Sequence, residues 1–114
     1  MPKEQLAEVK RILYGAPVST IAIPEEAASL SQANNFEIKA FAFPSQKEQL
    51  RAARIVRIGL IQNSIVLPTD APVNDQYEAI ERKIEKMIDA AAAAGVNIVC
   101  LQEAWRTLFV IDPS

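Results

Sequence analysis

The chain has 114 residues, of which half are hydrophobic and 23% are charged, and its formal net charge is −2 at pH 7. This composition is typical of an ordinary folded chain rather than a disordered one, and the charge gives no electrostatic case for nucleic acid or for an acidic membrane surface. Histidine is absent and Cys100 is the one cysteine, which excludes an internal disulfide and a Cys–His catalytic pair and argues against a zinc site. We therefore expect no metal, no cofactor, no membrane span and a reducing compartment such as the cytoplasm.

Residues 1–53 are predicted to form a helical arm followed by a connector. The first helix should end near Gly15, because glycine is common just after the last helical residue. Its apolar side chains fall on one face of the helix: Leu6, Val9, Ile12 and Leu13. Periodicity alone favours packing of this stripe on its own domain, but an arm that packs on another subunit is also consistent with the pattern.

The connector shows three local signals. Pro24 followed by two glutamates is typical of the start of a short helix. Alternating apolar and polar residues indicate an extended segment at 36–43. Ser45 and Glu48 have the spacing of a capping box, which predicts a helix that runs to about Ala53.

Residues 54–114 are predicted to begin an α/β domain. Runs rich in β-branched residues indicate strands at 54–63 and 96–101. Between them, a long helix should start with Asn74 as its N-cap and end at Gly95. Its apolar face follows three- and four-residue steps: Tyr77, Ile80, Ile84, Met87, Ile88 and Ala91.

This order of elements is a βαβ unit, in which the two strands run parallel. Strands that are apolar on both sides require cover on both faces of the sheet. One helix covers only one face, so the sequence predicts a domain that is truncated here.

Glu103 directly follows the second predicted strand. Ligands of open α/β sheets bind outside the carboxyl ends of parallel strands, and glutamate is a common general base. The position alone fits a loop glutamate that caps a helix or pairs with a lysine at least as well. Gln62 and Asn63 end the neighbouring strand, where they would either support Glu103 or cap that strand.

Other chemically capable side chains are assigned structural roles. Cys100 lies inside the strand, three residues before Glu103, so we expect a buried, small hydrophobic residue rather than a nucleophile. Lys83 and Lys86 should lie on the solvated side of the long helix. Trp105 is expected to pack against the domain rather than to line a pocket mouth.

A family resemblance rests on several stretches of the sequence: "EVKRILYG" at 8–15, "RIVRIGLIQN" at 54–63, "LPTDAPV" at 67–73 and "GVNIVCLQEAW" at 95–105. Over roughly residues 5–105 the chain resembles the nitrilase, or carbon–nitrogen hydrolase, superfamily. Within it, the arm and the "QEAW" ending point to the β-ureidopropionase family. The resemblance covers the N-terminal portion of such an enzyme.

The resemblance implies a four-layer α-β-β-α sandwich, of which residues 1–53 would supply the arm and residues 54–114 the incomplete first βαβ unit. It also implies a Glu–Lys–Cys triad, in which the cysteine attacks a carbonyl carbon, the glutamate is the general base and the lysine stabilises the oxyanion. Glu103 matches the glutamate. The family's lysine and cysteine come from later segments, so the chain by itself is expected to be inactive.

The tail departs from the family pattern after Trp105. A Pro-Phe pair is expected there, but the sequence reads "RTLFVIDPS", with Phe109 as a candidate remnant of the pair. We interpret the end at Ser114 as that of a truncated chain.

The expected function is hydrolysis of N-carbamoyl-β-alanine to β-alanine, ammonia and carbon dioxide in pyrimidine breakdown, carried out by the full-length enzyme. The expected partners are a ureido acid substrate and further copies of the chain in a homo-oligomer, without nucleic acid or membrane. Two alternatives are open: a non-catalytic fragment that binds full-length subunits, and a different amidase of the same superfamily.

Overall fold

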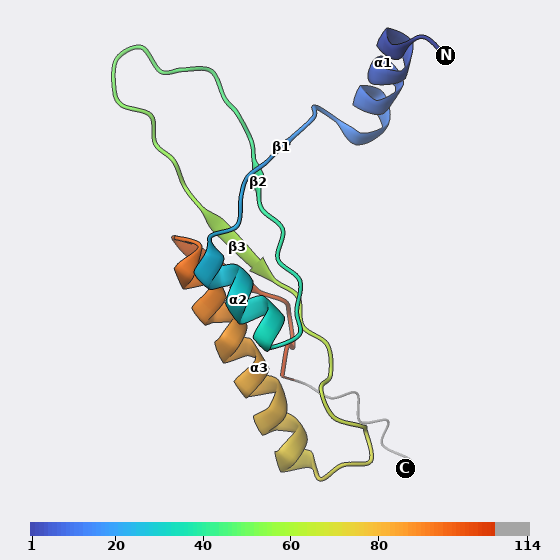
Figure 1. Ribbon diagram of the computed structural model, residues 1–114, viewed down its shortest axis with the longest axis vertical. Helices are drawn as coiled ribbons and strands as arrows, with labels where there is room; N and C mark the ends of the chain where they lie inside the picture. Colours follow the sequence, from blue (N-terminus) through green and yellow to red (C-terminus); the bar gives the residue numbers. More distant parts are fainter. Residues whose placement is uncertain (107–114) are drawn as a thin grey trace. The chain divides into compact units, whose positions relative to one another are not determined.

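The computed structural model describes residues 1–106. Phe109 and the rest of the segment 107–114 lie outside the described residues. The elements, in chain order, are α1 (Lys3–Tyr14), β1 (Ser19–Thr20), α2 (Glu25–Ala33), β2 (Phe41–Ala42), β3 (Ile58–Ile61), α3 (Val73–Ala93) and β4 (Ile98–Leu101) (Figure 1). The chain is therefore mixed α/β, as predicted.

The chain divides into two compact units, and each of them is made of two separate stretches of the sequence. The N-terminal unit contains Met1–Ala22 and Lys39–Ala53, and the α/β unit contains Ile23–Ile38 and the chain from Arg54 onward. Residues 23–38, which the sequence analysis placed in the connector, thus fold with the α/β unit.

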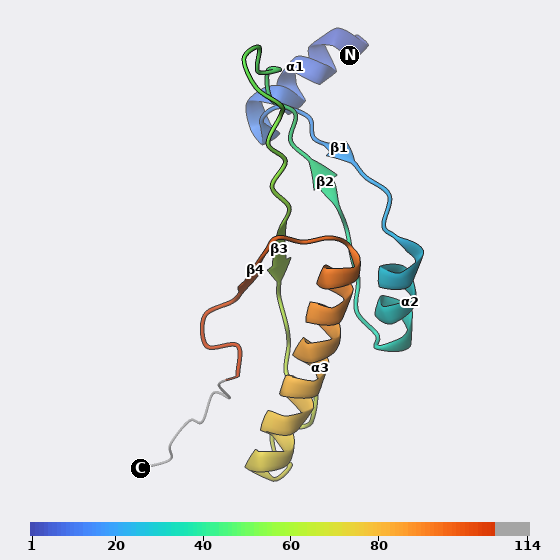
Figure 2. The ribbon, with the colours of Figure 1, turned by 90° about the vertical axis from the view of Figure 1, so that its left-hand side faces the viewer.

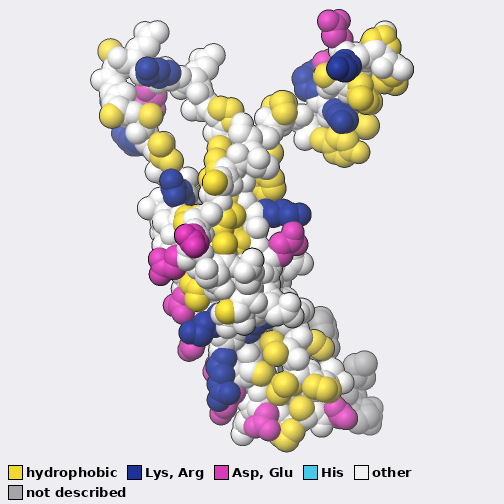
Figure 3. Space-filling view, in the orientation of Figure 1, with side chains coloured by type: hydrophobic (Ala, Val, Ile, Leu, Met, Phe, Trp, Pro, Cys, Tyr) yellow, Lys and Arg dark blue, Asp and Glu magenta, His cyan; other side chains and the backbone are white. Residues whose placement is uncertain are grey.

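The N-terminal unit consists of α1 and a short antiparallel pair. Ser19 of β1 pairs with Ala42 of β2. The predicted end of α1 is confirmed, because Gly15 follows its last residue in the left-handed region, at φ 81°. The unit does not cover the apolar stripe of α1, which contains no buried residue. Its hydrophobic side chains gather on one face of the helix in Figure 3.

The helix predicted between Ser45 and Ala53 is wrong. These residues form no regular element. Glu48 pairs instead with Arg51, whose Nη2 donates to Glu48 Oε1 at 2.9 Å. A capping box needs the glutamate to reach back to the backbone at its N-cap residue, and this ion pair turns Glu48 toward the following residues. The extended segment predicted at 36–43 is a strand only at Phe41–Ala42.

In the α/β unit, β3 and β4 are parallel, with Ile58 opposite Ile98 and Ile61 opposite Leu101. This confirms the predicted βαβ unit, although both strands are shorter than expected. Helix α3 connects them and lies between the strand pair and α2 (Figure 2). No helix within residues 1–106 is long and apolar enough to cross a membrane.

The core of the α/β unit contains Tyr77, Ile80, Ile84 and Met87 of the predicted apolar face of α3, whereas Ile88 of that face is 39% exposed. Ile80 and Ile84 are only 2% and 3% exposed, and partly buried hydrophobic side chains from both strand ends and α3 pack against them: Ile61, Tyr77, Met87 and Trp105. The packing role predicted for Trp105 is confirmed. Ala27 of α2 is also fully buried.

The two ends of α3 follow from different residues. The helix starts at Val73 with Pro72 at the N-cap, so the predicted N-cap, Asn74, lies inside the first turn. Proline fixes φ at a value compatible with a helix start and needs no hydrogen bond. At the other end, Gly95 has φ 76°. Its N–H bonds to the Ala92 carbonyl and the next N–H bonds to the Ala91 carbonyl, the pattern of a Schellman cap.

The second face of the β3–β4 pair is open in the described part of the chain. Leu60 is 81% exposed, and its partner across the parallel ladder, Cys100, is exposed too. The expectation that Cys100 is buried is therefore wrong for this structure. Cys100 shares a face with Leu60, opposite the α3 side where Ile61 packs, and no described element covers that face.

Candidate functional site

Glu103 lies in a turn of residues 103–106 beyond the carboxyl end of β4, and it is exposed. Within residues 1–106 its carboxylate has no hydrogen bond or ion pair, so it is neither a helix cap nor the partner of a described lysine. The next residue, Ala104, has φ 51°, a left-handed conformation that residues other than glycine seldom adopt.

Two hydrogen bonds connect this turn to the end of β3. Gln102 Nε2 donates to the Asn63 carbonyl at 3.0 Å, and Asn63 Nδ2 donates to the Trp105 carbonyl at 2.9 Å. They flank Glu103 on both sides in sequence. Of the two roles that the sequence left open for Asn63, its side chain supports the Glu103 turn rather than capping its own strand.

The turn is also anchored to α3. Trp105 packs on the core cluster of Ile80 and Ile84. Arg106 Nε lies 2.7 Å from Glu81 Oε1, and its guanidinium lies 4.9 Å from the centre of the Tyr77 ring. Sequence reasoning missed Arg106, because neither of its partners on α3 is near it in the sequence.

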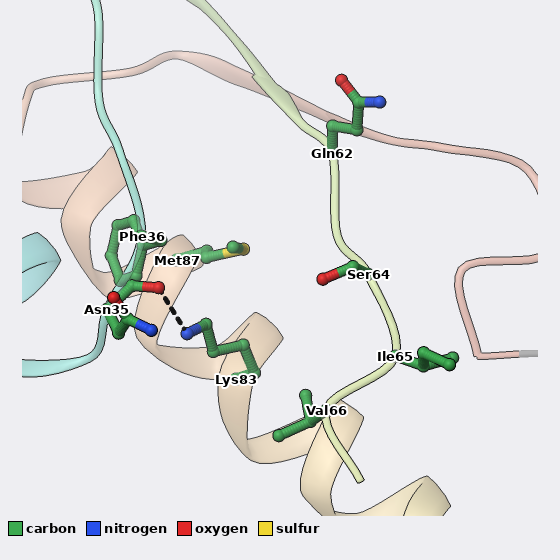
Figure 4. A pocket seen from close by; sticks show the side chains of 8 residues that line it. All are labelled: Asn35, Phe36, Gln62, Ser64, Ile65, Val66, Lys83 and Met87. Atoms are coloured by element: carbon green, nitrogen blue, oxygen red, sulfur yellow. Dashed lines mark hydrogen bonds between the residues drawn. The ribbon is translucent and has the colours of Figure 1, made fainter. Parts of the chain in front are cut away.

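A pocket lies between the end of α2, α3 and the segment after β3 (Figure 4). Its lining residues are Asn35, Phe36, Gln62, Ser64, Ile65, Val66, Lys83 and Met87. Figure 4 shows Ser64 and Val66 turned toward α3, whereas the Ile65 side chain points to the opposite side. The lining contains no carboxylate or thiol, so Glu103 is not part of this pocket.

Lys83 does not lie on a solvated face, and the prediction that placed it there is wrong. Its Nζ donates to the carbonyl oxygens of Asn34 and Asn35, the latter at 2.8 Å. It also lies 5.8 Å from the centre of the Phe36 ring. The α2 end supplies acceptors that helical periodicity cannot show. Lys86 is exposed, as predicted, with Nζ 3.5 Å from Asp89.

The site therefore offers one exposed carboxylate at a strand end, held on a supported turn. Among the described residues there is no group of three or more histidine, cysteine, aspartate or glutamate side chains that would hold a metal ion. A carboxylate in such a place is chemically able to accept or donate a proton, and the turn of residues 103–106 holds no nucleophilic side chain beside it.

Comparison with known proteins supplies an independent observation. No family model matches the chain. The chain is 49% identical to β-ureidopropionase of Arabidopsis thaliana over 110 residues. That alignment covers 93% of this chain but 27% of the relative. The resemblance stated from the sequence is thus confirmed, and the chain spans about a quarter of the length of this relative, consistent with an N-terminal portion.

Proposed function

We propose that this chain is the N-terminal portion of an amidohydrolase that converts N-carbamoyl-β-alanine to β-alanine, ammonia and carbon dioxide. The observation that carries the proposal is the 49% identity to Arabidopsis β-ureidopropionase. The position of Glu103 supports it, because ligands of open α/β sheets bind beyond the carboxyl ends of parallel strands.

In this proposal Glu103 is the general base. Its carboxylate takes the proton of the attacking thiol and passes it to the departing ammonia. It then takes a proton from the hydrolytic water and returns it to the sulfur as the carbon–sulfur bond breaks. The thiol and the oxyanion-stabilising ammonium come from the remainder of the enzyme. Cys100 does not provide the thiol, because it lies within β4 rather than at the strand end. The isolated 114-residue chain is accordingly inactive.

The test uses a chimera in which the aligned residues of this chain replace the matching segment of Arabidopsis β-ureidopropionase. We expect the chimera to release ammonia from N-carbamoyl-β-alanine. Glu103→Gln keeps the side chain's shape and removes the base, so kcat should fall by about two to four orders of magnitude. Glu85→Gln, at an exposed position of α3, is the matched control and should leave kcat unchanged.

Two results would contradict the proposal. One is a folded chimera without turnover of this substrate, which would point to a different amidase of the same superfamily. The other is near-normal kcat in Glu103→Gln with an unchanged melting temperature, which would remove Glu103 from the catalytic step.

A second role, in subunit contact, is favoured by the uncovered stripe of α1. Ile12 and Leu13 are 68% and 66% exposed, although burying such side chains is worth about 1.5–3 kcal/mol each. We propose that this stripe packs on another subunit of a homo-oligomer. In the chimera, Leu13→Glu should shift size-exclusion elution toward a smaller assembly, whereas Lys10→Glu on the same helix should not. An unchanged assembly in Leu13→Glu would contradict this role.

A further inference from the structure

The turn that carries Glu103 is strained at one residue. Ala104, which directly follows Glu103, has φ 51°. A left-handed conformation costs a residue with a Cβ roughly 1–2 kcal/mol, so it persists only where the surroundings hold it. Contacts that hold the turn therefore also fix the direction in which the Glu103 carboxylate projects.

Asn63 takes part in both of the hydrogen bonds that hold this turn to β3. Its carbonyl accepts from Gln102 on one side of Glu103, and its side-chain amide donates to Trp105 on the other. The second bond joins residues 42 positions apart in the sequence. A residue that only capped its own strand would bond to its neighbours, so this contact serves the turn.

The side chain at position 63 must donate a hydrogen bond to the Trp105 carbonyl. Asn63 Oδ1 is buried and has no hydrogen-bond partner among the described residues, whereas Nδ2 donates to the Trp105 carbonyl. An aspartate of the same size would place a second acceptor against that carbonyl and bury an unpaired charge, which is costly. Asparagine is the residue of this size that meets the need.

We propose that Asn63 is a positioning residue for catalysis: through the Trp105 carbonyl it holds the strained turn and thereby aims the carboxylate of Glu103. The inference rests on the proposed function, since it assigns to Asn63 an effect that acts through the general base. A displacement of about 1 Å in a catalytic group can lower the rate by about 100-fold, so a loosened turn has a measurable cost.

The experiment measures kcat and KM for N-carbamoyl-β-alanine in the chimera described above. Asn63→Ala should lower kcat by about 10- to 100-fold, with KM close to that of the parent, because the aim of the base is disturbed and not the binding of substrate. Asn63→Asp, which keeps the size and loses the donor, should show a similar loss. Asn74→Ala, the same substitution at an exposed position of α3, is the control and should retain the parental kcat.

A double variant separates positioning from general structural support. In the Glu103→Gln background the base is already absent, so Asn63→Ala should produce no further loss of kcat. An equal fold-loss in both backgrounds would overturn the proposal, as would an unchanged kcat in Asn63→Ala. Full turnover of the Glu103→Gln single variant would instead overturn the proposed function, so the two failures are distinguishable.

A second site guards against a folding defect in the Asn63 variants. Gln102 is exposed and contributes the other hydrogen bond of the turn, so Gln102→Ala removes support without opening a buried position. It should lower kcat in the same direction and leave the melting temperature unchanged. A parental kcat in Gln102→Ala, together with a melting temperature lowered by Asn63→Ala, would show a structural role only and overturn the proposal.

Discussion

Lys83 provides a sharp test of how α2 is held in the α/β unit. Its ammonium donates to two carbonyl oxygens at the end of α2, those of Asn34 and Asn35, and lies over the Phe36 ring. Lys83→Met keeps an unbranched side chain that packs on α3 but removes all three interactions. The carbonyls at the negative end of the α2 dipole then lose a cation as well.

The expected cost follows from these contacts. Hydrogen bonds to a charged group contribute about 1.5–3 kcal/mol each when well buried, and a cation–π contact at a partly exposed site contributes about 0.5–1 kcal/mol. Lys83 is only partly buried, and water replaces some of the lost interactions. We therefore expect Lys83→Met to lower the free energy of local opening of α2 by about 2 kcal/mol in total. At 1.4 kcal/mol for each factor of ten, that is about a 30-fold increase in opening.

Hydrogen exchange measures this opening directly. In the chimera, the amides of Glu25–Ala33 should exchange about 30-fold faster in Lys83→Met than in the parent. Lys86→Met on the same helix removes only an exposed pair with an Nζ–Oδ2 distance of 3.5 Å, worth about 0.5 kcal/mol or less, and should change exchange by about twofold at most. Equal exchange in the two variants would show that the Lys83 contacts do not hold α2, and the reasoning would be refuted.

Three further outcomes follow. Gly95→Ala should lower the free energy of unfolding of the chimera by about 1 kcal/mol or more, seen as a lower urea midpoint, because φ is 76° and the added Cβ would lie 3.1 Å from Arg57 Nη1. An unchanged midpoint would contradict this. The Arg11 guanidinium hydrogen-bonds to Glu8 and lowers the pKa of that carboxyl from its ordinary value of 4.5. The stabilisation from this pair is therefore present above about pH 4.5 and is lost as the pH falls through the lowered pKa. In Arg11→Gln, an NMR titration should show the pKa of Glu8 rising. The isolated 114-residue chain should unfold without a single cooperative transition, by circular dichroism in urea, because one sheet face is uncovered; cooperative unfolding of a monodisperse monomer would contradict this.

The sequence predicted those features of the α/β unit that depend on local patterns. The apolar face of α3, its end at Gly95 and the parallel strands on either side follow from spacing and backbone preference alone. The place of Glu103 beyond the second strand follows from the same order of elements. These features need no knowledge of distant contacts.

The features that were mispredicted depend on groups distant in sequence or on competing local bonds. Lys83 was assigned to solvent because its acceptors lie 48 and 49 residues away, at the end of α2. The exposure of Cys100 depends on which face α3 covers, and the predicted helix at 45–53 fails where Glu48 bonds to Arg51 instead. The sequence placed Asn63 near the site, but it could not predict which groups of Asn63, Gln102 and Trp105 form the two hydrogen bonds that hold the Glu103 turn.

The division of the chain into units has a practical consequence for removing the arm. The polypeptide enters the α/β unit at Ile23, leaves it after Ile38 and returns at Arg54. A shortened protein that begins at Arg54 would discard α2, and with it the carbonyl oxygens that receive the Lys83 ammonium. Lys83 would then lose both of its carbonyl acceptors. A protein shortened to remove α1 should therefore begin at Ile23, which keeps α2. Residues 39–53 then stay as the connection between the two stretches of the α/β unit.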